Sequence, residues 1–442
     1  MTTPAASQQS LGTLADLQLF TGAPQVENFC RMAELVQTRA MAPSSHPREW
    51  PQGDPVELPL AFSFDGQERS VQEFLDETET SALLVLREGR VVHESYHRTG
   101  GPDVPWLSMS VAKSFVATLV GIAVADGLIG DVEDPISDHV AVEPGSAYDG
   151  VSIRSVLQMS SGARWNEDYS DPDADPLRIA DATSGVRGDH DTIVATMPRE
   201  TAPDTVCRYN SCDTQALAAL VRAATGRSVA EYMQEKLCEP LGFTSPGCWV
   251  VDPKGVEMGY AGLNLVARDF ARLGELYRLR GTCDGVQVVP ADWVDAATTA
   301  SLPHLRPGRV RVGTGTTPEG YGYQWWLPPS DREELMAAGV YNQYVYVDPA
   351  AGVTVVKLSA NRRYGTADAE HAHHEGQSLQ LLRALVRSVG RPAGRPAPRR
   401  RAHAPGSGPS GERRCTPTSA CPRSGTGPGA PGPEPDLALT RS

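Results

Sequence analysis

The chain has 442 residues, of which 21% are charged and 6% aromatic, and its formal net charge is -14. This composition is typical of a folded protein with one or two large cores, and the acidic balance argues against nucleic acid or an anionic membrane as a partner. The sequence has no apolar run of about 18 residues, no basic leader followed by an apolar run, and no Cys-x-x-Cys pair among its eight cysteines, so we expect a cytoplasmic protein with reduced thiols and no membrane partner.

The first 70 residues are interpreted as an N-terminal segment and a connector. Residues 24–40 are expected to form a short helix, because a proline is tolerated in the first turn. Residues 41–60 are rich in proline and polar residues, which favours an extended connector over a helix.

Two β-rich pairs of segments lie near the two ends of the following region. Residues 82–86 and 90–96 surround Glu-Gly, and residues 344–347 and 353–358 surround Asp-Pro-Ala-Ala-Gly, so each pair predicts a hairpin. The segments between them are mainly helical in pattern, for example residues 111–126, 212–224 and 266–277. We therefore predict an α+β domain over 71–390, with an antiparallel sheet from both chain ends and a helical subdomain at about 115–260.

The last 52 residues differ from the rest of the chain. Residues 391–442 hold 11 prolines, nine arginines and few large apolar residues. Such a segment buries too little apolar surface to offset its ordering entropy, so we predict that it is disordered.

The sharpest local signal is Ser110-Val-Ala-Lys113 at the start of an apolar helical run. Residues three apart share a helix face, so the serine hydroxyl and the lysine amine can meet. A buried lysine can act as the base that a serine nucleophile needs, and a helix N-terminus favours a developing oxyanion. The alternative is an N-capping serine followed by a surface lysine, but the chain has only four lysines and this one lies in an apolar helix.

Several ordered segments carry a family resemblance: SMSVAKSFVATLVGIAVADGLI, VSIRSVLQMSSGARW, EPLGFTSPGCW, AGLNLVARDFARLGELY and YGYQWW. In this order they resemble β-lactamase-like serine hydrolases, and most closely the 6-aminohexanoate-oligomer hydrolases. The resemblance covers about residues 71–386 and implies that Ser110 is the nucleophile. It further implies that Tyr209, of Tyr209-Asn-Ser211, shares proton transfer with Lys113, and that Ser211 hydrogen-bonds the lysine or the substrate amide. A buried tyrosine with a satisfied hydroxyl is the alternative for Tyr209.

The third motif of that family aligns with Ala337-Ala338-Gly339-Val340. The lysine that penicillin-recognising members carry there is absent. The backbone N–H groups of Ser110 and Val340 would still form an oxyanion hole, and Gly339 would permit close approach of the substrate.

Further substrate contacts are implied at the loop and strand positions that match the family. Glu167 and Tyr169 lie in a polar loop, where a tyrosine would close over the substrate amide and a solvated acidic loop is the alternative. Asn264 lies in the AGLNLVARDF segment. Trp325 and Trp326 are neighbours on a strand, so one is expected to face the pocket and the other the core.

We therefore predict a serine hydrolase that cleaves amide or ester bonds of a small molecule through an acyl-enzyme, without a cofactor or metal. A β-lactamase or D,D-peptidase is the enzymatic alternative, and a catalytically silent penicillin-binding-like protein is the alternative of another class. The histidines at 371, 373 and 374 could bind a metal, but an exposed helix start is favoured for them. A homodimer is compatible with the sequence.

Overall fold

The computed structural model describes residues 11–389, apart from residues 170, 172, 187, 367 and 368. The C-terminal segment whose disorder we predict, residues 391–442, lies outside the described part. Within the described part, the longest apolar helices are too short to cross a bilayer.

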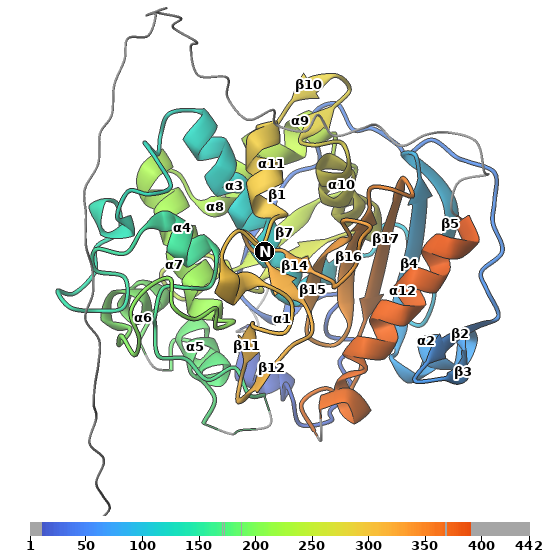
Figure 1. Ribbon diagram of the computed structural model, residues 1–442, viewed down its shortest axis with the longest axis horizontal. Helices are drawn as coiled ribbons and strands as arrows, with labels where there is room; N and C mark the ends of the chain where they lie inside the picture. Colours follow the sequence, from blue (N-terminus) through green and yellow to red (C-terminus); the bar gives the residue numbers. More distant parts are fainter. Residues whose placement is uncertain (1–10, 170, 172, 187, 367–368, 390–442) are drawn as a thin grey trace, which may run out of the picture. The chain divides into compact units, whose positions relative to one another are not determined.

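A seven-stranded antiparallel sheet joins the two ends of the domain (Figure 1). The central contact is between β4 (Thr80–Arg87) and β17 (Val353–Ser359), which pair from Arg87 with Val353 onward. The sheet order is β13-β14-β15-β16-β17-β4-β5. The other strands are β5 (Arg90–Tyr96), β13 (Gly320–Tyr321), β14 (Trp326–Leu327), β15 (Leu335–Gly339) and β16 (Gln343–Asp348). Both predicted hairpins and the α+β class are confirmed.

The two faces of the sheet are covered by helices from different parts of the chain. Helix α10 (Ala267–Arg278) packs against β16 and β17, and α12 (Glu375–Val389) packs against β17 (Figure 1). Alternate residues of β4 belong to different cores: Leu84 and Leu86 lie in the core that contains α10, whereas Leu83 and Val85 lie in the core that contains α12. The period of two therefore buries this strand on both faces.

The helical region lies to one side of this sheet (Figure 1). Its long helices are α3 (Ala112–Ala125) and α7 (Ser211–Thr225), which pack against each other. The shorter ones are α4 (Ile153–Leu157), α5 (Asp175–Thr183), α6 (His190–Thr196), α8 (Val229–Met233) and α9 (Glu239–Leu241). Helices are thus present at the three segments expected to be helical.

A second, four-stranded sheet includes a strand where we expected a helix. Its order is β1-β7-β8-β6, with β1 at Thr38–Met41, β7 at Gly247–Val250, β8 at Leu263–Leu265 and β6 at Trp106–Leu107. The predicted helix over 24–40 is wrong, because only α1 (Met32–Leu35) is α-helical there. Pairing of β1 with β7, about 200 residues away along the chain, overrides the local preference.

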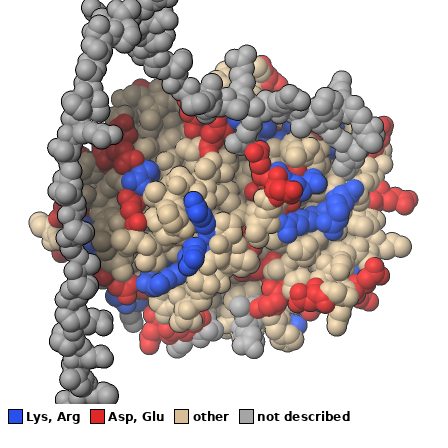
Figure 2. Space-filling view, viewed as in Figure 1, with Lys and Arg blue, Asp and Glu red and all other residues tan. Residues whose placement is uncertain are grey.

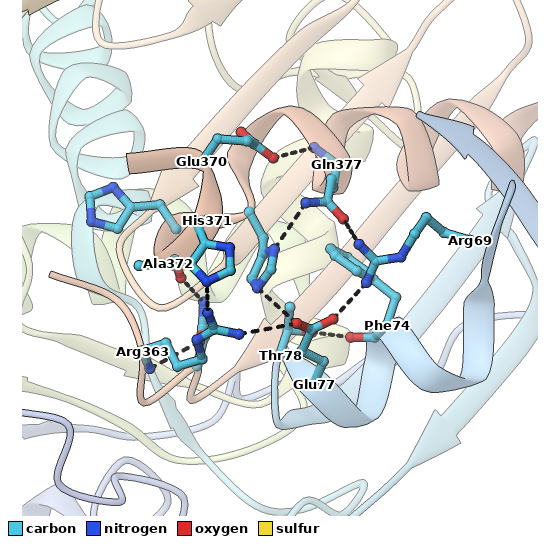
Figure 3. A network of polar contacts seen from close by, with 12 residues as sticks. Arg69, Phe74, Glu77, Thr78, Arg363, Glu370, His371, Ala372 and Gln377 are labelled. Atoms are coloured by element: carbon cyan, nitrogen blue, oxygen red, sulfur yellow. Dashed lines mark hydrogen bonds and ion pairs between the residues drawn. The ribbon is translucent and has the colours of Figure 1, made fainter. Parts of the chain in front are cut away.

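Polar contacts join the segment around the start of α12 to α2 (Val71–Glu77), as Figure 3 shows. The Glu77 carboxylate accepts from Arg69 and lies 3.3 Å from a guanidinium nitrogen of Arg363, while Arg69 also donates to Gln377. These contacts fix the start of α12 over the N-terminal edge of the domain.

The histidines at 371, 373 and 374 contact other side chains of this region. His371 is hydrogen-bonded to Arg363, the His373 ring stacks on Tyr364 at 3.9 Å, and His374 Nε2 lies 3.4 Å from a Glu77 oxygen. His374 is only 3% exposed, so the expectation of an exposed helix start is wrong for this residue. Within residues 11–389 as described, these side chains make no group suited to hold a metal ion.

Surface charges of both signs are interspersed on the face shown in Figure 2. Many are paired; Arg154, for example, contacts both Glu133 and Asp204. The absence of a nucleic-acid partner remains a prediction from the acidic composition.

Candidate active site

Ser110 lies in a tight turn between β6 and α3. Residues Met109–Val111 form a 3-10 turn that leads directly into the helix, so the predicted position at a helix N-terminus is confirmed. Met109 has φ +46, a left-handed conformation that is uncommon for a residue other than glycine. Such strain next to a candidate nucleophile persists only where the surrounding packing holds it. Ser110 itself keeps 7% exposure, so its hydroxyl is at the inner end of the site.

The Lys113 amine lies beside the Ser110 hydroxyl, as the spacing predicted. Its Nζ is 2.9 Å from Ser110 Oγ, 3.0 Å from Ser211 Oγ and 2.9 Å from the Tyr260 carbonyl oxygen. The side chain is 1% exposed, and this burial lowers the pKa of Lys113 to about 7, although the Glu167 carboxylate opposes the shift. A substantial fraction of the amine is therefore neutral near pH 7 and can accept a proton.

The ring of Tyr209 lies beside the Lys113 amine. Lys113 Nζ lies 5.2 Å from the centre of the Tyr209 ring, so the cation faces the ring. Burial and the Glu167 charge raise the pKa of Tyr209 well above its usual value, and a hydrogen bond with the Ser110 side chain opposes this only in part. Desolvation is the largest of these effects and favours the protonated hydroxyl, and the part of Tyr209 in proton transfer stays a prediction.

Glu167 occupies a different place from the one expected for a substrate contact. Its carboxylate accepts from the Trp165 indole N–H, from the Tyr169 hydroxyl at 2.6 Å and from the Ser211 hydroxyl at 2.8 Å. The residue is 2% exposed. Side chains of the protein itself contact both carboxylate oxygens, and the assignment of Glu167 as a substrate-binding residue stays a prediction.

The end of β15 lies against the backbone of the nucleophile. A Cβ atom at Gly339 would lie 2.9 Å from Ser110 N and 2.9 Å from Ser108 O, which is closer than real Cβ atoms approach backbone. Only glycine fits this contact without a shift. Val340, the next residue, carries the N–H expected as the second oxyanion donor, and this role stays a prediction.

The remaining candidates divide between the site and the core. Trp326 is half-buried and its ring lies 4.9 Å from that of Tyr209, whereas Trp325 is fully buried against Tyr277 at 4.4 Å. Trp325 is therefore the core member of the pair and is withdrawn as a substrate contact. Asn264 is buried in β8 and its side-chain amide donates to the Gly262 carbonyl.

The N-terminal segment contributes to the site, which sequence reasoning missed. The Phe20 ring lies 4.6 Å from that of Tyr169 and 5.4 Å from that of Tyr341, and the Phe20 N–H donates to the Tyr341 hydroxyl at 2.7 Å. The 3-10 turn Leu14–Leu17 also packs against α5. No local pattern signals these contacts, since the partners are about 150 and 320 residues apart in the chain.

The sequence of this chain is similar to those of known hydrolases. The profile of the beta-lactamase family matches residues 68–380. A 6-aminohexanoate-dimer hydrolase from Paenarthrobacter ureafaciens is 31% identical over 367 residues, which are 81% of this chain and 90% of that protein. The family match at 68–380 includes the Ser110 turn, the start of α7 and the end of β15.

Solved structures agree with this fold. A Bacillus anthracis protein provisionally named as a 6-aminohexanoate-dimer hydrolase superimposes with a TM-score of 0.72 at 21% identity, covering 86% of this chain and 97% of that one. EstCE1, described as a hydrolase with promiscuous acyltransferase activity, superimposes with a TM-score of 0.52 at 17% identity, covering 71% of this chain and 96% of that one. At these identities, the two structures are similar to this chain in fold.

Proposed function

The chain belongs to the beta-lactamase family and is a hydrolase, and we propose that it cleaves linear amide or ester bonds through an acyl-enzyme on Ser110. The observation that carries this proposal is the 2.9 Å contact between Ser110 Oγ and the buried Lys113 Nζ. A serine hydroxyl becomes an effective nucleophile only when a base removes its proton, and a lysine with a pKa of about 7 can do so near neutral pH.

In the first half-reaction, Ser110 Oγ attacks the carbonyl carbon while its proton moves to Lys113. The negative charge that forms on the carbonyl oxygen is stabilised by the N–H groups of Ser110 and Val340. Tyr209 is protonated at the start, so its hydroxyl can give its proton to the leaving nitrogen or oxygen as the carbonyl bond breaks. Tyr209 then takes the proton that Lys113 received from Ser110, so that Lys113 is neutral again before water enters. The result is an ester of Ser110 and a free amine or alcohol.

In the second half-reaction, water attacks the Ser110 ester. Lys113 again takes the proton, now from water, and Ser110 Oγ recovers a proton as the acid leaves. Trp326, beside Tyr209, and Tyr169 would line the path of the acyl chain. Asn264 stays a candidate substrate contact, although the amide contact to Gly262 must then open or share.

The proposed substrate class is linear amides such as those of ω-amino acids, together with short esters. Two observations support it: the 31% identical relative is a 6-aminohexanoate-dimer hydrolase, and the strand at Ala337-Ala338-Gly339 offers no cation for a β-lactam carboxylate. An unpaired carboxylate in a partly desolvated pocket costs several kcal/mol, on the order of a thousandfold in rate. The β-lactamase or D,D-peptidase activity is therefore the weaker alternative.

The test is covalent labelling followed by a substrate comparison. A fluorophosphonate probe should modify Ser110, as located by mass spectrometry, and Ser110→Ala should abolish both labelling and turnover. The kcat/KM values for a 6-aminohexanoate dimer and p-nitrophenyl butyrate should exceed that for nitrocefin. No labelling of a folded protein would favour the silent ligand-binding alternative, and nitrocefin as the best substrate would favour the β-lactamase alternative.

Two coarser expectations accompany this proposal. We propose a cytoplasmic location from the cysteine pattern, and the sequence is also compatible with a homodimer. Cell fractionation and light scattering of the full chain test them directly.

A further inference from the structure

The Glu167 carboxylate contacts Ser211 beside the proposed base, yet the proposed reaction gives it no role. Its Oε1 accepts from Ser211 Oγ at 2.8 Å and from Tyr169 at 2.6 Å, and its Oε2 accepts from Trp165 Nε1. Because a carboxylate only accepts, each of these three partners must use its own hydrogen to contact it. A buried anion with this many fixed donors has a set orientation.

The direction of the Ser211 hydrogen bond follows from this contact. Serine has one hydroxyl hydrogen, and the contact with Glu167 takes it. Ser211 Oγ can then only accept from Lys113 Nζ, which lies 3.0 Å away on its other side. The third partner of the amine, the Tyr260 carbonyl oxygen at 2.9 Å, can also only accept.

The count of hydrogens on Lys113 now decides where its lone pair points. A neutral amine has two hydrogens and one lone pair, and Ser211 and Tyr260 each accept one of the hydrogens. The remaining position faces Ser110 Oγ at 2.9 Å. The lone pair of neutral Lys113 is therefore aimed at the hydroxyl hydrogen of Ser110, as a general base requires.

We propose that Glu167 is a positioning residue for this reaction: by taking the Ser211 hydrogen, it fixes the direction of the chain Ser110–Lys113–Ser211–Glu167, so that protons flow from Ser110 to Lys113. This inference rests on the proposed function. Without the carboxylate, the Ser211 hydroxyl is free to donate to the Lys113 lone pair, and it then competes with Ser110 for the base.

The charge of Glu167 adds a second, separable effect. Besides Glu167, the groups around the amine are the hydroxyls of Ser110 and Ser211, the Tyr260 carbonyl and the rings of Tyr209 and Tyr260, which are uncharged while both phenols stay protonated. The carboxylate raises the pKa of Lys113 against the effect of burial. Removing the charge should therefore move the acid limb of activity to lower pH, because Lys113 then loses its proton at lower pH.

The experiment is a double-mutant cycle on the acylation rate of Ser110 by a fluorophosphonate, measured on the alkaline plateau where Lys113 is neutral. Glu167→Gln should slow labelling by about tenfold to a hundredfold, a range set by general-base catalysis. In a Ser211→Ala background the same change should matter less than about threefold, because the chain is already broken. In a Tyr169→Phe background, Glu167→Gln should keep its full effect on the labelling rate of Ser110.

Equal effects of Glu167→Gln in the wild-type and Ser211→Ala backgrounds would overturn the proposal. Should Glu167→Gln fail to fold, Ser211→Ala alone decides: a folded protein with wild-type plateau labelling would also overturn it. The pH profile gives the independent readout, since Glu167→Gln should shift the acid limb downward, whereas a purely structural defect would leave its midpoint in place.

A matched control is Glu275→Gln. Glu275 is a buried glutamate that accepts from the Thr354 hydroxyl at 2.6 Å and pairs with Arg278, away from Ser110. This change should leave both the plateau and the acid limb unaltered. If wild-type Ser110 is never labelled, the proposed function fails; if Ser110 is labelled equally fast in every variant, only the role of Glu167 fails.

Discussion

Two lysines of this chain are buried in nearly the same chemical setting, Lys113 in the helical region and Lys357 in the main sheet. Lys113 is 1% exposed and Lys357 is 0% exposed. The Lys113 amine contacts the hydroxyls of Ser110 and Ser211, and the Lys357 amine contacts Thr78 Oγ1 at 3.0 Å and Ser359 Oγ at 2.6 Å. Burial lowers the pKa of each to about 7.

Their surroundings differ in what lies next to the amine. Ser359 is 0% exposed, and Thr78, at the end of α2 in Figure 3, already donates to the Phe74 carbonyl. Ser110 instead keeps some exposure and follows the strained Met109. A carboxylate, that of Glu167, accepts from Ser211, whereas the hydrogen bonds of Lys357 within the described part of the chain go to two hydroxyls.

The comparison teaches that a lowered pKa does not by itself make a catalytic base. Desolvation alone produces the shift in both lysines. Catalysis further needs a nucleophile that a substrate can reach and hydrogen-bond partners that direct the lone pair toward it. By these criteria Lys113 is the proposed base, and Lys357 is a buried amine whose desolvation costs stability.

The largest expected difference is in activity after removal of each amine. Lys113→Met should lower kcat/KM for p-nitrophenyl butyrate by about a thousandfold, within the range for loss of a general base. Lys357→Met should stay within about threefold of wild type, because its amine contacts Thr78 and Ser359 and not Ser110. A comparable loss in both variants would break the comparison.

A smaller effect is expected from crowding at two glycines. Gly339→Ala places a Cβ against Ser110 N and should lower kcat by about tenfold to a hundredfold, as for a displaced oxyanion donor. Gly274→Ala meets the Thr354 side chain at 2.6 Å, beside the strand that carries Lys357, and should lower stability while leaving kcat unchanged. Thermal unfolding and initial rates of both variants check this. An unchanged kcat for Gly339→Ala would argue against the oxyanion site.

The pH dependence of activity should follow Lys113. The neutral amine is the active form, so kcat/KM should rise as pH increases and should reach half its plateau near pH 7. The Lys357→Met variant should show the same midpoint. If Lys357→Met shifted the midpoint of the pH profile, the protonation of the two amines would be coupled.

The smallest effect concerns stability. The folded-state pKa of Lys357, about 7, is below its ordinary value of 10.5, so between these pH values the unfolded chain binds a proton that the folded chain does not. Stability therefore rises with pH across this window. Lys357→Met should stabilise the protein at pH 7 by roughly 1–3 kcal/mol and reduce this rise, as urea unfolding at pH 7 and pH 9 would measure. A destabilised variant would mean that the hydroxyl contacts outweigh desolvation.

The sequence was most informative where chemistry is local. Ser110 and Lys113 are three residues apart, so helix geometry alone brings them together, and the hairpins follow from their turn residues. Ser211 was identified as a candidate because it follows Tyr209 by two residues in the Tyr209-Asn-Ser211 motif of the family. These features depend on short spacings, which periodicity and resemblance can read.

What the sequence missed depends on contacts over long separations. The direction of the Glu167 carboxylate depends on Ser211, 44 residues later, and its charge in a loop of many acids looked like a solvated surface. Burial raises the pKa of Tyr209, and burial is a property of the assembled fold. The strand at 38–41 was likewise invisible, because its partner lies near residue 250.

The position of β1 at the edge of the four-stranded sheet has a practical consequence for engineering the protein. A version trimmed to the family boundary at residue 68 would lose β1 and leave β7, with the buried Trp249 at its centre, as an unprotected edge. Uncovered apolar edge strands pair with strands of other molecules and cause aggregation. The trimmed enzyme should therefore accumulate in inclusion bodies, whereas a version that starts near residue 11 should keep its protective strand.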